Sequence, residues 1–205
     1  MRGTVAGVLL AAGEGSRFGR PKALIELDGQ TLAERGVTML HAGGADPVLI
    51  VTGAASVDLG PEHQVRTVYN EEWRTGMGSS LRAALRALTA PDDPAVDAVV
   101  VALADQPLVG AAAVARLIAA YRAGATVAVA AYDGRPRNPV LLAREHWPEV
   151  AAMAAGDQGA RAFLRARPDL VTLVECGDTG RPDDIDTPAD LDGITARKPG
   201  SPTSG

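Results

Sequence analysis

The chain has 205 residues, 46% of them hydrophobic, which is enough for one globular domain with its own core. Its formal net charge of −5 and its aromatic content of 3% argue against general nucleic-acid binding, which needs a basic surface and stacking side chains. The single cysteine, Cys176, excludes an internal disulfide, no Cys/His cluster has the spacing of a zinc site, and no apolar run has the length of a membrane span.

The N-terminal part begins with a short β-rich run at residues 5–10 that ends at glycines. This run is short for a secretory signal and little charge precedes it, so we expect a cytoplasmic protein. Thr31 and Glu34 have the spacing of a capping box, which predicts the start of a helix, and the glycines at 43–44 predict its end. Residues 47–53 then read as a buried strand.

Strands and helices continue to alternate through the middle of the chain. Residues 65–70 read as a strand, and Ser79 is a suitable cap for the next helix. One face of that helix is apolar, with Leu81, Leu85 and Leu88, and the other is basic, with Arg82 and Arg86. Residues 97–105 form a near-continuous apolar run, typical of a strand covered on both faces. A helix follows, predicted by the spacing of Val114, Leu117, Ile118 and Tyr121.

The C-terminal part adds two strands and two helices. Residues 126–132 and 170–176 read as strands, with a helix over 159–167 between them. Thr187 caps a last helix that has proline in its first turn. Residues 196–205 are rich in Pro, Gly and Ser, which predicts a disordered tail behind a single domain of residues 1–195.

The alternation predicts an α/β fold, a Rossmann-like three-layer sandwich with a mostly parallel, doubly wound sheet and right-handed crossovers. Ligands of such sheets bind outside the carboxyl ends of the strands. This rule selects the loops that follow Leu10 and Ala104 and the loop near Asn70, and all three carry unusual residues. The agreement is the first indication of a functional site.

The first of these loops reads LLAAGEGSRFGRPKAL over residues 9–24. A P-loop needs lysine directly after its last glycine, but Lys22 comes three residues after Gly19. A dinucleotide fingerprint fits no better, because Gly19 is one residue late and no acid ends the second strand. The remaining interpretations are a triphosphate loop, in which Arg17 and Lys22 neutralise charge beside bare backbone, or a glycine loop with solvated cations.

The same stretch resembles the signature loop of the molybdopterin-type nucleotidyltransferases, a branch of the sugar-nucleotide and cytidylyl transferase superfamily. The matching residues are Leu10, Ala11, Ala12, Gly13, Arg17, Gly19, Pro21 and Lys22, and Phe18 stands where methionine is common. Further segments follow in the family's order, namely residues 70–73, 76–81, 102–107, 137–139, 156–161 and 184–188. The pair LAAG and LADQP is most similar to the molybdenum cofactor cytidylyltransferases.

The resemblance implies a magnesium-dependent enzyme with the fold of the nucleotide-diphospho-sugar transferases. Such an enzyme transfers CMP from CTP to a molybdopterin-type cofactor and releases pyrophosphate, and a molybdenum hydroxylase would be its partner. The alternatives are a guanylyltransferase, a sugar-phosphate or polyol-phosphate nucleotidyltransferase, and a non-enzymatic molybdenum cofactor carrier or insertion partner. We expect no nucleic-acid partner and no membrane partner.

Site residues follow from the matching positions. Arg17, Lys22 and Asp105 would be catalytic, and Asp105 and Asp186 would hold Mg²⁺, with Asp184 as a stand-in for Asp186. The nucleotide-binding residues would be Leu10, Ala11, Ala12, Gly13, Arg17, Lys22, Gly78, Ser79, Ser80 and Asp105. The acceptor would contact Asn138, Asp157 and Arg161.

Structural roles compete with these functional ones. Asp105 is also a candidate cap for a helix start at 107–113, and Asp186 is a candidate charge at the last helix start. Ser79 and Ser80, like residues 156–161, are also candidate helix caps. The three histidines, His41, His63 and His146, are expected to be structural or on the surface. The small number of histidines is consistent with a phosphate monoester acceptor. Such an acceptor is already ionised at neutral pH and needs alignment and charge neutralisation rather than a side-chain base.

Overall fold

The computed structural model describes residues 3–90 and 95–196. Its centre is a seven-stranded sheet with the order β5-β4-β1-β6-β8-β7-β9. The strands are β1 (Val5–Leu10), β4 (Val48–Thr52), β5 (Val65–Tyr69), β6 (Ala98–Leu103), β7 (Val127–Tyr132), β8 (Arg135–Ala143) and β9 (Val171–Glu175). Neighbouring strands pair in parallel except for the two pairs that contain β8. The sheet is therefore mostly parallel, as predicted.

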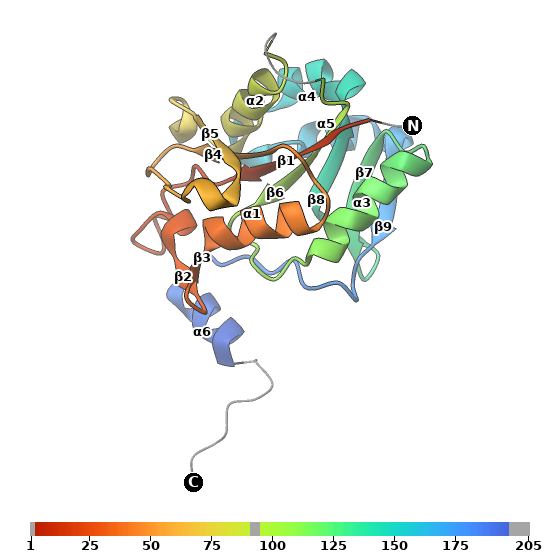
Figure 1. Cartoon of the computed structure of the whole chain (residues 1–205). Helices are drawn as coiled ribbons and strands as arrows, with labels where there is room; N and C mark the ends of the chain where they lie inside the picture. The colour runs from red at the N-terminus through yellow and green to blue at the C-terminus, as the bar shows by residue number, and fades with distance from the viewer. Residues whose placement is uncertain (1–2, 91–94, 197–205) are drawn as a thin grey trace.

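Helices cover both faces of the sheet and complete three layers (Figure 1). On one face lie α1 (Leu32–Ala42) and α3 (Ala111–Ala123), and on the other lie α2 (Met77–Ala87), α4 (Trp147–Met153) and α5 (Arg161–Ala166). Short 3-10 helices occupy Lys22–Leu24, Pro61–His63, Trp73–Thr75, Arg144–His146, Gly156–Gln158 and Pro168–Leu170. The predicted α/β sandwich is confirmed. None of the helices that the described residues form is long and apolar enough to cross a membrane.

Burial explains why the central strands are so apolar. Every residue of β1, β4, β6 and β7 is buried, because helices pack on both sides of them. Each fully buried Val, Leu or Ile side chain contributes about 1.5–3 kcal/mol relative to exposure. The edge strands β5 and β9 keep partly exposed residues and contribute less. The core thus fixes β1 and β6, whose carboxyl ends carry two of the three loops of interest, while the third loop follows the edge strand β5.

Two of the expected helix starts can be compared directly with the structure. Thr31 and Glu34 form both hydrogen bonds of the capping box at the start of α1, as predicted. Ser79 does not cap α2, because that helix begins at Met77 with Gly76 as its N-cap. The Ser79 hydroxyl lies within the first turn and donates to the backbone carbonyls of Glu72 and Gly76. That prediction was wrong by one helical turn.

The sequence interpretation also missed strand β8. This strand carries two prolines and a basic first half, which hid its strand character. Asp133 and Gly134 form the turn that joins it to β7, with φ angles of 52° and 70°. An Asp-Gly pair with two positive φ angles is a common two-residue hairpin connection and was the available signal. Helix α4 was missed too, and α5 is shorter than the predicted range of 159–167.

A small hydrophobic cluster lies apart from the main core. It joins the hairpin of β2 (Glu26–Leu27) and β3 (Gln30–Thr31) to the last helix, α6 (Pro188–Ala196). We call it the satellite cluster; its members are Phe18, Ile25, Leu27, Leu32, Ile185, Leu191 and Ile194. In Figure 1 the hairpin and α6 extend together from the body of the protein. Ala196 ends this helix, and residues 197–205 of the predicted disordered tail lie outside the described residues.

Candidate functional site

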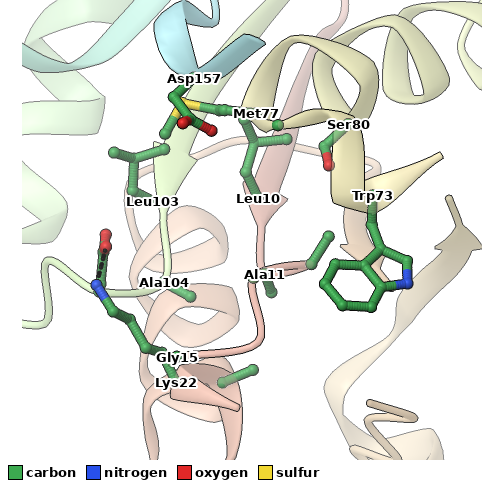
Figure 2. Close-up of a pocket in the computed structure, with 15 residues that line it drawn as sticks. Leu10, Ala11, Gly15, Lys22, Trp73, Met77, Ser80, Leu103, Ala104 and Asp157 are labelled. Carbon is green, nitrogen blue, oxygen red and sulfur yellow. Dashed lines mark hydrogen bonds and ion pairs between the residues drawn. The ribbon is translucent and has the colours of Figure 1, made fainter. Parts of the chain in front are cut away.

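A pocket lies at the carboxyl ends of β1 and β6, where the sequence analysis placed the site (Figure 2). Its lining residues are Leu10, Ala11, Ala12, Gly13, Gly15, Lys22, Ala23, Trp73, Gly76, Met77, Ser80, Leu103, Ala104, Asp105 and Asp157. Lys22 and Trp73 lie on opposite sides of this pocket, with Ala11 between them. We call it the loop pocket, because the loop after β1 forms one of its walls.

The conformation of this loop depends on Gly15. Its φ angle is +63°, and its carbonyl accepts hydrogen bonds from the backbone N–H groups of Phe18 and Gly19 at 2.8 and 2.9 Å. A Cβ atom at this position would lie 2.1 Å from the carbonyl oxygen of Arg20. Only glycine fits such a turn, which folds the chain back so that Lys22 reaches the pocket. The glycines here shape the loop as well as exposing its backbone.

Lys22 lies between two carboxylates. Its Nζ atom is 2.9 Å from Asp105 Oδ2 and 2.5 Å from Asp186 Oδ1. The Lys22 and Asp105 side chains are only 20% and 25% exposed, whereas Asp186 is 43% exposed. Burial lowers the pKa of Lys22, but the charges and hydrogen bonds of both carboxylates outweigh burial, and the net pKa lies above its ordinary value. Lys22 is therefore a permanent cation at neutral pH.

The two aspartates come from distant parts of the chain. Asp105 follows β6, and its backbone carbonyl accepts a 2.8 Å hydrogen bond from the N–H of Ile185. Ile185 is fully buried in the satellite cluster, which anchors the neighbouring Asp186. Helix α3 begins at Ala111 with Gly110 as its N-cap, so Asp105 caps no helix there.

Asp184 and Asp186 have different surroundings, although only one residue separates them. Asp184 Oδ1 accepts a 2.8 Å hydrogen bond from Gln106 Nε2, whereas Asp186 contacts Lys22. Arg17 also reaches Asp186, with 3.2 Å between its guanidinium and Oδ2, but its side chain is 74% exposed and does not line the loop pocket. Asp186 thus fits the expected metal position better than Asp184.

The residues present fit a divalent cation on a nucleotide. Asp105 and Asp186 already converge on one cationic group, the Lys22 ammonium. Within the ranges 3–90 and 95–196, no group of three or more His, Cys, Asp or Glu side chains is arranged to hold a metal ion. Two carboxylates suit Mg²⁺, which usually takes one or two protein carboxylates and completes its shell with phosphate oxygens and water.

The opposite wall of the loop pocket is built by the chain after β5. Buried Asn70 donates through Nδ2 to the hydroxyls of Ser79 and Ser80, at 2.8 and 3.0 Å. Of these two serines only Ser80 lines the pocket. Gly78, another predicted nucleotide contact, packs instead against backbone, since a Cβ atom there would lie 2.6 Å from the amide nitrogen of Ala155. Gly78 and Ser79 therefore shape the wall without lining it.

Trp73 is a lining residue that the sequence interpretation missed. It precedes α2 and packs on Gly53, where a Cβ atom would lie 2.5 Å from the Cβ of Trp73. The guanidinium of Arg74 lies over its indole ring, 4.3 Å from the ring centroid. The available signal was a tryptophan in a loop between a predicted strand and a predicted helix, in a chain with few aromatic residues.

A second pocket of about 660 Å³ lies beside the first and is lined by β7, β8, β9 and α5. Its residues are Gln106, Val129, Pro136, Arg137, Asn138, Val140, Arg161, Leu164, Arg165, Pro168, Val171, Leu173 and Asp184. A third, much smaller pocket is lined by residues of both, sharing Leu10 and Met77 with the first and Asn138 and Arg161 with the second. We call the second one the basic pocket.

The three predicted acceptor residues separate here. Asn138 and Arg161 line the basic pocket, but Asp157 lines the loop pocket beside Met77 (Figure 2). Asp157 caps no helix either, because α5 begins at Arg161 with Ala160 as its N-cap and without a side-chain cap. The interpretation missed Arg137 and Arg165, which add positive charge to the basic pocket.

None of the three histidines lines either pocket. His41 hydrogen-bonds to the backbone carbonyl of His63 at 2.9 Å, and His146 packs against Phe163. The site therefore offers a cation and carboxylates, which suit charge neutralisation and alignment of phosphates, and a wall that combines Ser80 with Trp73 and Met77.

The chain is similar to known proteins in sequence and in fold. The sequence pattern of the MobA-like NTP transferase domain matches residues 7–171. The chain is 39% identical to "Nicotine blue oxidoreductase" of Paenarthrobacter nicotinovorans, over 89% of this chain and 92% of the relative. It is 37% identical to "Probable molybdenum cofactor guanylyltransferase" of Opitutus terrae, over 63% of this chain and 62% of the relative.

Solved structures share the whole fold. The homolog of Mycobacterium tuberculosis Rv0371c from Mycobacterium sp. strain JC1 superposes with a TM-score of 0.80 at 32% identity, covering 94% of this chain and 95% of its own. The Rv0371C complex with manganese from M. tuberculosis H37Rv has a TM-score of 0.71 at 24% identity, covering 96% and 100%. The arrangement of strands and helices is therefore common to these proteins.

Proposed function

The chain belongs to the MobA-like NTP transferase domain family and is a nucleotidyltransferase. From this premise we propose that it transfers CMP from CTP to a molybdopterin-type cofactor and releases pyrophosphate. The donor nucleotide would occupy the loop pocket and the acceptor the basic pocket. The similarity to a protein named as a molybdenum cofactor guanylyltransferase supports this class of acceptor.

One observation carries the proposal, namely that neighbouring residues line different pockets. Asp105 lines the loop pocket, and the next residue, Gln106, lines the basic pocket. Asp184 lines the basic pocket, and Asp186, two residues further on, contacts Lys22. The pair of carboxylates thus lies between the two pockets, where an acceptor phosphate and the α-phosphorus of a nucleotide would meet.

The chain's own residues can then align and neutralise the phosphates. Lys22 would supply positive charge to the triphosphate inside the loop pocket, and Arg17, which pairs with Asp186 outside the pocket lining, would add charge nearby. Bare backbone at Gly13 and Gly15 permits close approach. Ser80 and Trp73 form the wall available to the nucleoside. Because the attacking phosphate is already ionised, its alignment between the two pockets would be sufficient and no side-chain base would be needed.

Asp105 and Asp186 would hold Mg²⁺, which supplies charge neutralisation at the phosphates during transfer. The assignment is supported by the contacts of both carboxylates with one cationic group, the Lys22 ammonium. Mg²⁺ rather than another divalent ion remains part of the proposal.

The basic pocket fits an acceptor that combines an apolar body with an anionic group. Its lining combines the apolar Val129, Val140 and Leu173 with Arg161 and Arg165, which lie about one helical turn apart in α5. Guanidinium groups recognise phosphate by paired hydrogen bonds, so these two arginines are suited to a phosphorylated acceptor.

The test is pyrophosphate release with Mg²⁺ and molybdopterin-type cofactor, measured with CTP, GTP, UTP and ATP in parallel. We expect preference for CTP, because LAAG and LADQP are most similar to the cytidylyltransferases. Each polar group left unpaired against a wrong base would cost about 1–3 kcal/mol. Equal or faster turnover with GTP would overturn the choice of donor and leave the transfer reaction. No turnover with any of the four would overturn the transfer itself.

The similarity to a relative named nicotine blue oxidoreductase favours a second candidate, a redox reaction on nicotine blue. Absorbance of nicotine blue, followed with NADH or NADPH as reductant, measures that activity directly. Lys22→Ala is expected to reduce pyrophosphate release, because it weakens triphosphate binding, and an undiminished change in nicotine blue absorbance in that variant would separate the two candidates. A cytoplasmic location and a molybdenum hydroxylase partner stay predictions, to be checked by fractionation and by co-purification.

A further inference from the structure

Asp186 lies in a short segment whose backbone is held by a single carboxylate. Asp190 Oδ2 accepts hydrogen bonds from the backbone N–H of Asp186 at 3.0 Å and from that of Thr187 at 2.7 Å. It also accepts from the Thr187 hydroxyl at 2.8 Å. Three donors therefore converge on one oxygen. Two of them are the backbone N–H groups of the peptide bonds that flank the Asp186 α-carbon.

Helix α6, which carries Asp190, is anchored to the loop after β1. Leu191 and Ile194 of α6 pack in the satellite cluster together with Phe18, which lies between Arg17 and Gly19 in that loop. On the other side of the segment, Ile185 is fully buried in the cluster and bonds through its N–H to the carbonyl of Asp105. The Asp186 segment is thus fixed at Ile185 by packing and at Thr187 by Asp190.

We infer that Asp190 is a positioning residue, which holds the backbone of Asp186 so that its carboxylate faces Lys22 and Asp105. The inference rests on the proposed function, in which Asp186 holds the divalent cation. Among the described residues, the side-chain hydrogen bonds of Asp190 go to Asp186 and Thr187 and not to Lys22 or Asp105. The hydrogen bonds from Thr187 are the largest cause of a lowered pKa of Asp190, and the Lys22 charge is near enough to add to that effect. A group that orients a metal ligand through the backbone is expected to change metal affinity when it is removed.

A purely structural role makes a different prediction. Asp190 forms a reciprocal pair with Thr187 at the start of α6, since the Asp190 N–H also contacts the Thr187 hydroxyl at 3.3 Å. Loss of such a cap lowers the free energy of unfolding by about 1 kcal/mol and has no reason to alter cation binding. Stability and metal dependence must therefore be measured separately.

Asp190→Ala removes all three hydrogen bonds that the carboxylate accepts, whereas Asp190→Asn keeps one side-chain oxygen that can accept them. Asp192→Ala is the matched control, because Asp192 lies on the same helix, is exposed and takes no part in these contacts. Two readouts are needed on the full chain, the Mg²⁺ concentration for half-maximal pyrophosphate release and Mn²⁺ binding in the presence of CTP by calorimetry. Thermal unfolding of each variant reports the fold.

We expect Asp190→Ala to weaken Mn²⁺ binding and to raise the Mg²⁺ requirement about tenfold, the lower end for groups that orient metal ligands. Asp190→Asn should recover most of this loss, and Asp192→Ala should behave as the wild type. In an Asp186→Asn background, Asp190→Ala should have no further effect on the metal, because the carboxylate that it positions is gone.

Unchanged metal binding in a folded Asp190→Ala protein would reduce Asp190 to a helix cap and overturn the inference, as would additive effects of Asp186→Asn and Asp190→Ala. If the wild type binds Mn²⁺ with CTP but releases no pyrophosphate, the proposed function fails and the Mn²⁺ comparison still decides the role of Asp190. If the wild type binds no Mn²⁺, the inference fails as well.

Discussion

Lys22 Nζ and Asp105 Oδ2 lie 2.9 Å apart although 83 positions separate the two residues in the chain. The pair joins the loop after β1 to the loop after β6, which are adjacent because β1 and β6 pair in parallel along their whole length. Lys22 simultaneously contacts Asp186, so one ammonium bridges two carboxylates. This arrangement is the source of the first two predictions.

Lys22→Ala should lower triphosphate affinity about tenfold or more, since a lost charge-assisted interaction is worth about 1.5–3 kcal/mol. The same variant should bind Mn²⁺ alone no more weakly than the wild type, because the ammonium no longer competes with a cation for the two carboxylates. Calorimetry with CTP and with Mn²⁺ measures both. Arg20→Ala is the control, as an exposed cation of the same loop; unaltered CTP affinity in Lys22→Ala would contradict the role of the loop.

Asp105→Asn and Asp186→Asn should each reduce pyrophosphate release, by tenfold for every 1.36 kcal/mol of lost transition-state stabilisation. The double variant should lose much less than the two single losses combined, because both carboxylates act on one cation. The measurement is the rate of release against Mg²⁺ concentration for all three variants. A normal Mg²⁺ dependence in Asp186→Asn would leave Asp105 as the only carboxylate on the metal.

Trp73 should report nucleotide binding by its fluorescence, because it lines the loop pocket. The other tryptophan, Trp147, is 3% exposed and donates to the carbonyl of Leu142 on the far side of the sheet from α1 and α3. Titration with CTP should change the emission of the wild type and of Trp147→Phe, but not of Trp73→Phe. A response that persists in Trp73→Phe would place the nucleoside elsewhere.

Arg161→Ala should raise the KM for the acceptor and leave the KM for CTP unchanged, since Arg161 lines the basic pocket and not the loop pocket. Loss of one charged hydrogen-bonding partner predicts an effect of about tenfold. Steady-state kinetics with each substrate varied in turn separates the two constants. Arg122→Ala, an exposed change on α3, serves as the control; an equal rise in both KM values would contradict separate donor and acceptor pockets.

Local sequence features predicted the parts of the fold that depend on local physics. The apolar runs at 97–105 and 47–53 became the buried strands β6 and β4, because a strand covered on both faces must be apolar throughout. The Thr31–Glu34 spacing gave the start of α1, since a capping box needs only residues within one turn. The loop motif around Lys22 indicated phosphate chemistry for the same reason, as its residues lie close together in the chain.

Other features were decided by contacts between distant segments. Asp157 was expected beside the acceptor but lies in the loop pocket, and Gly78 was expected at the nucleotide but packs on the backbone of Ala155. In the same way, the choice between Asp184 and Asp186 depends on which of them faces Lys22 and which faces Gln106. None of these outcomes is encoded by spacing along the chain.

The sequence by itself determined the α/β class, the position of the loop after β1 and the chemical kind of the site, because periodicity, capping and charge are properties of neighbouring residues. Only the tertiary structure decided which carboxylates meet at Lys22 and that the basic pocket exists at all. Strand β8 illustrates the reason, since it runs antiparallel between β6 and β7 and pairs with β6 only as far as Val140. Its first residues, Arg137 and Asn138 among them, thereby reach the pocket wall, a placement fixed by sheet register rather than by sequence distance.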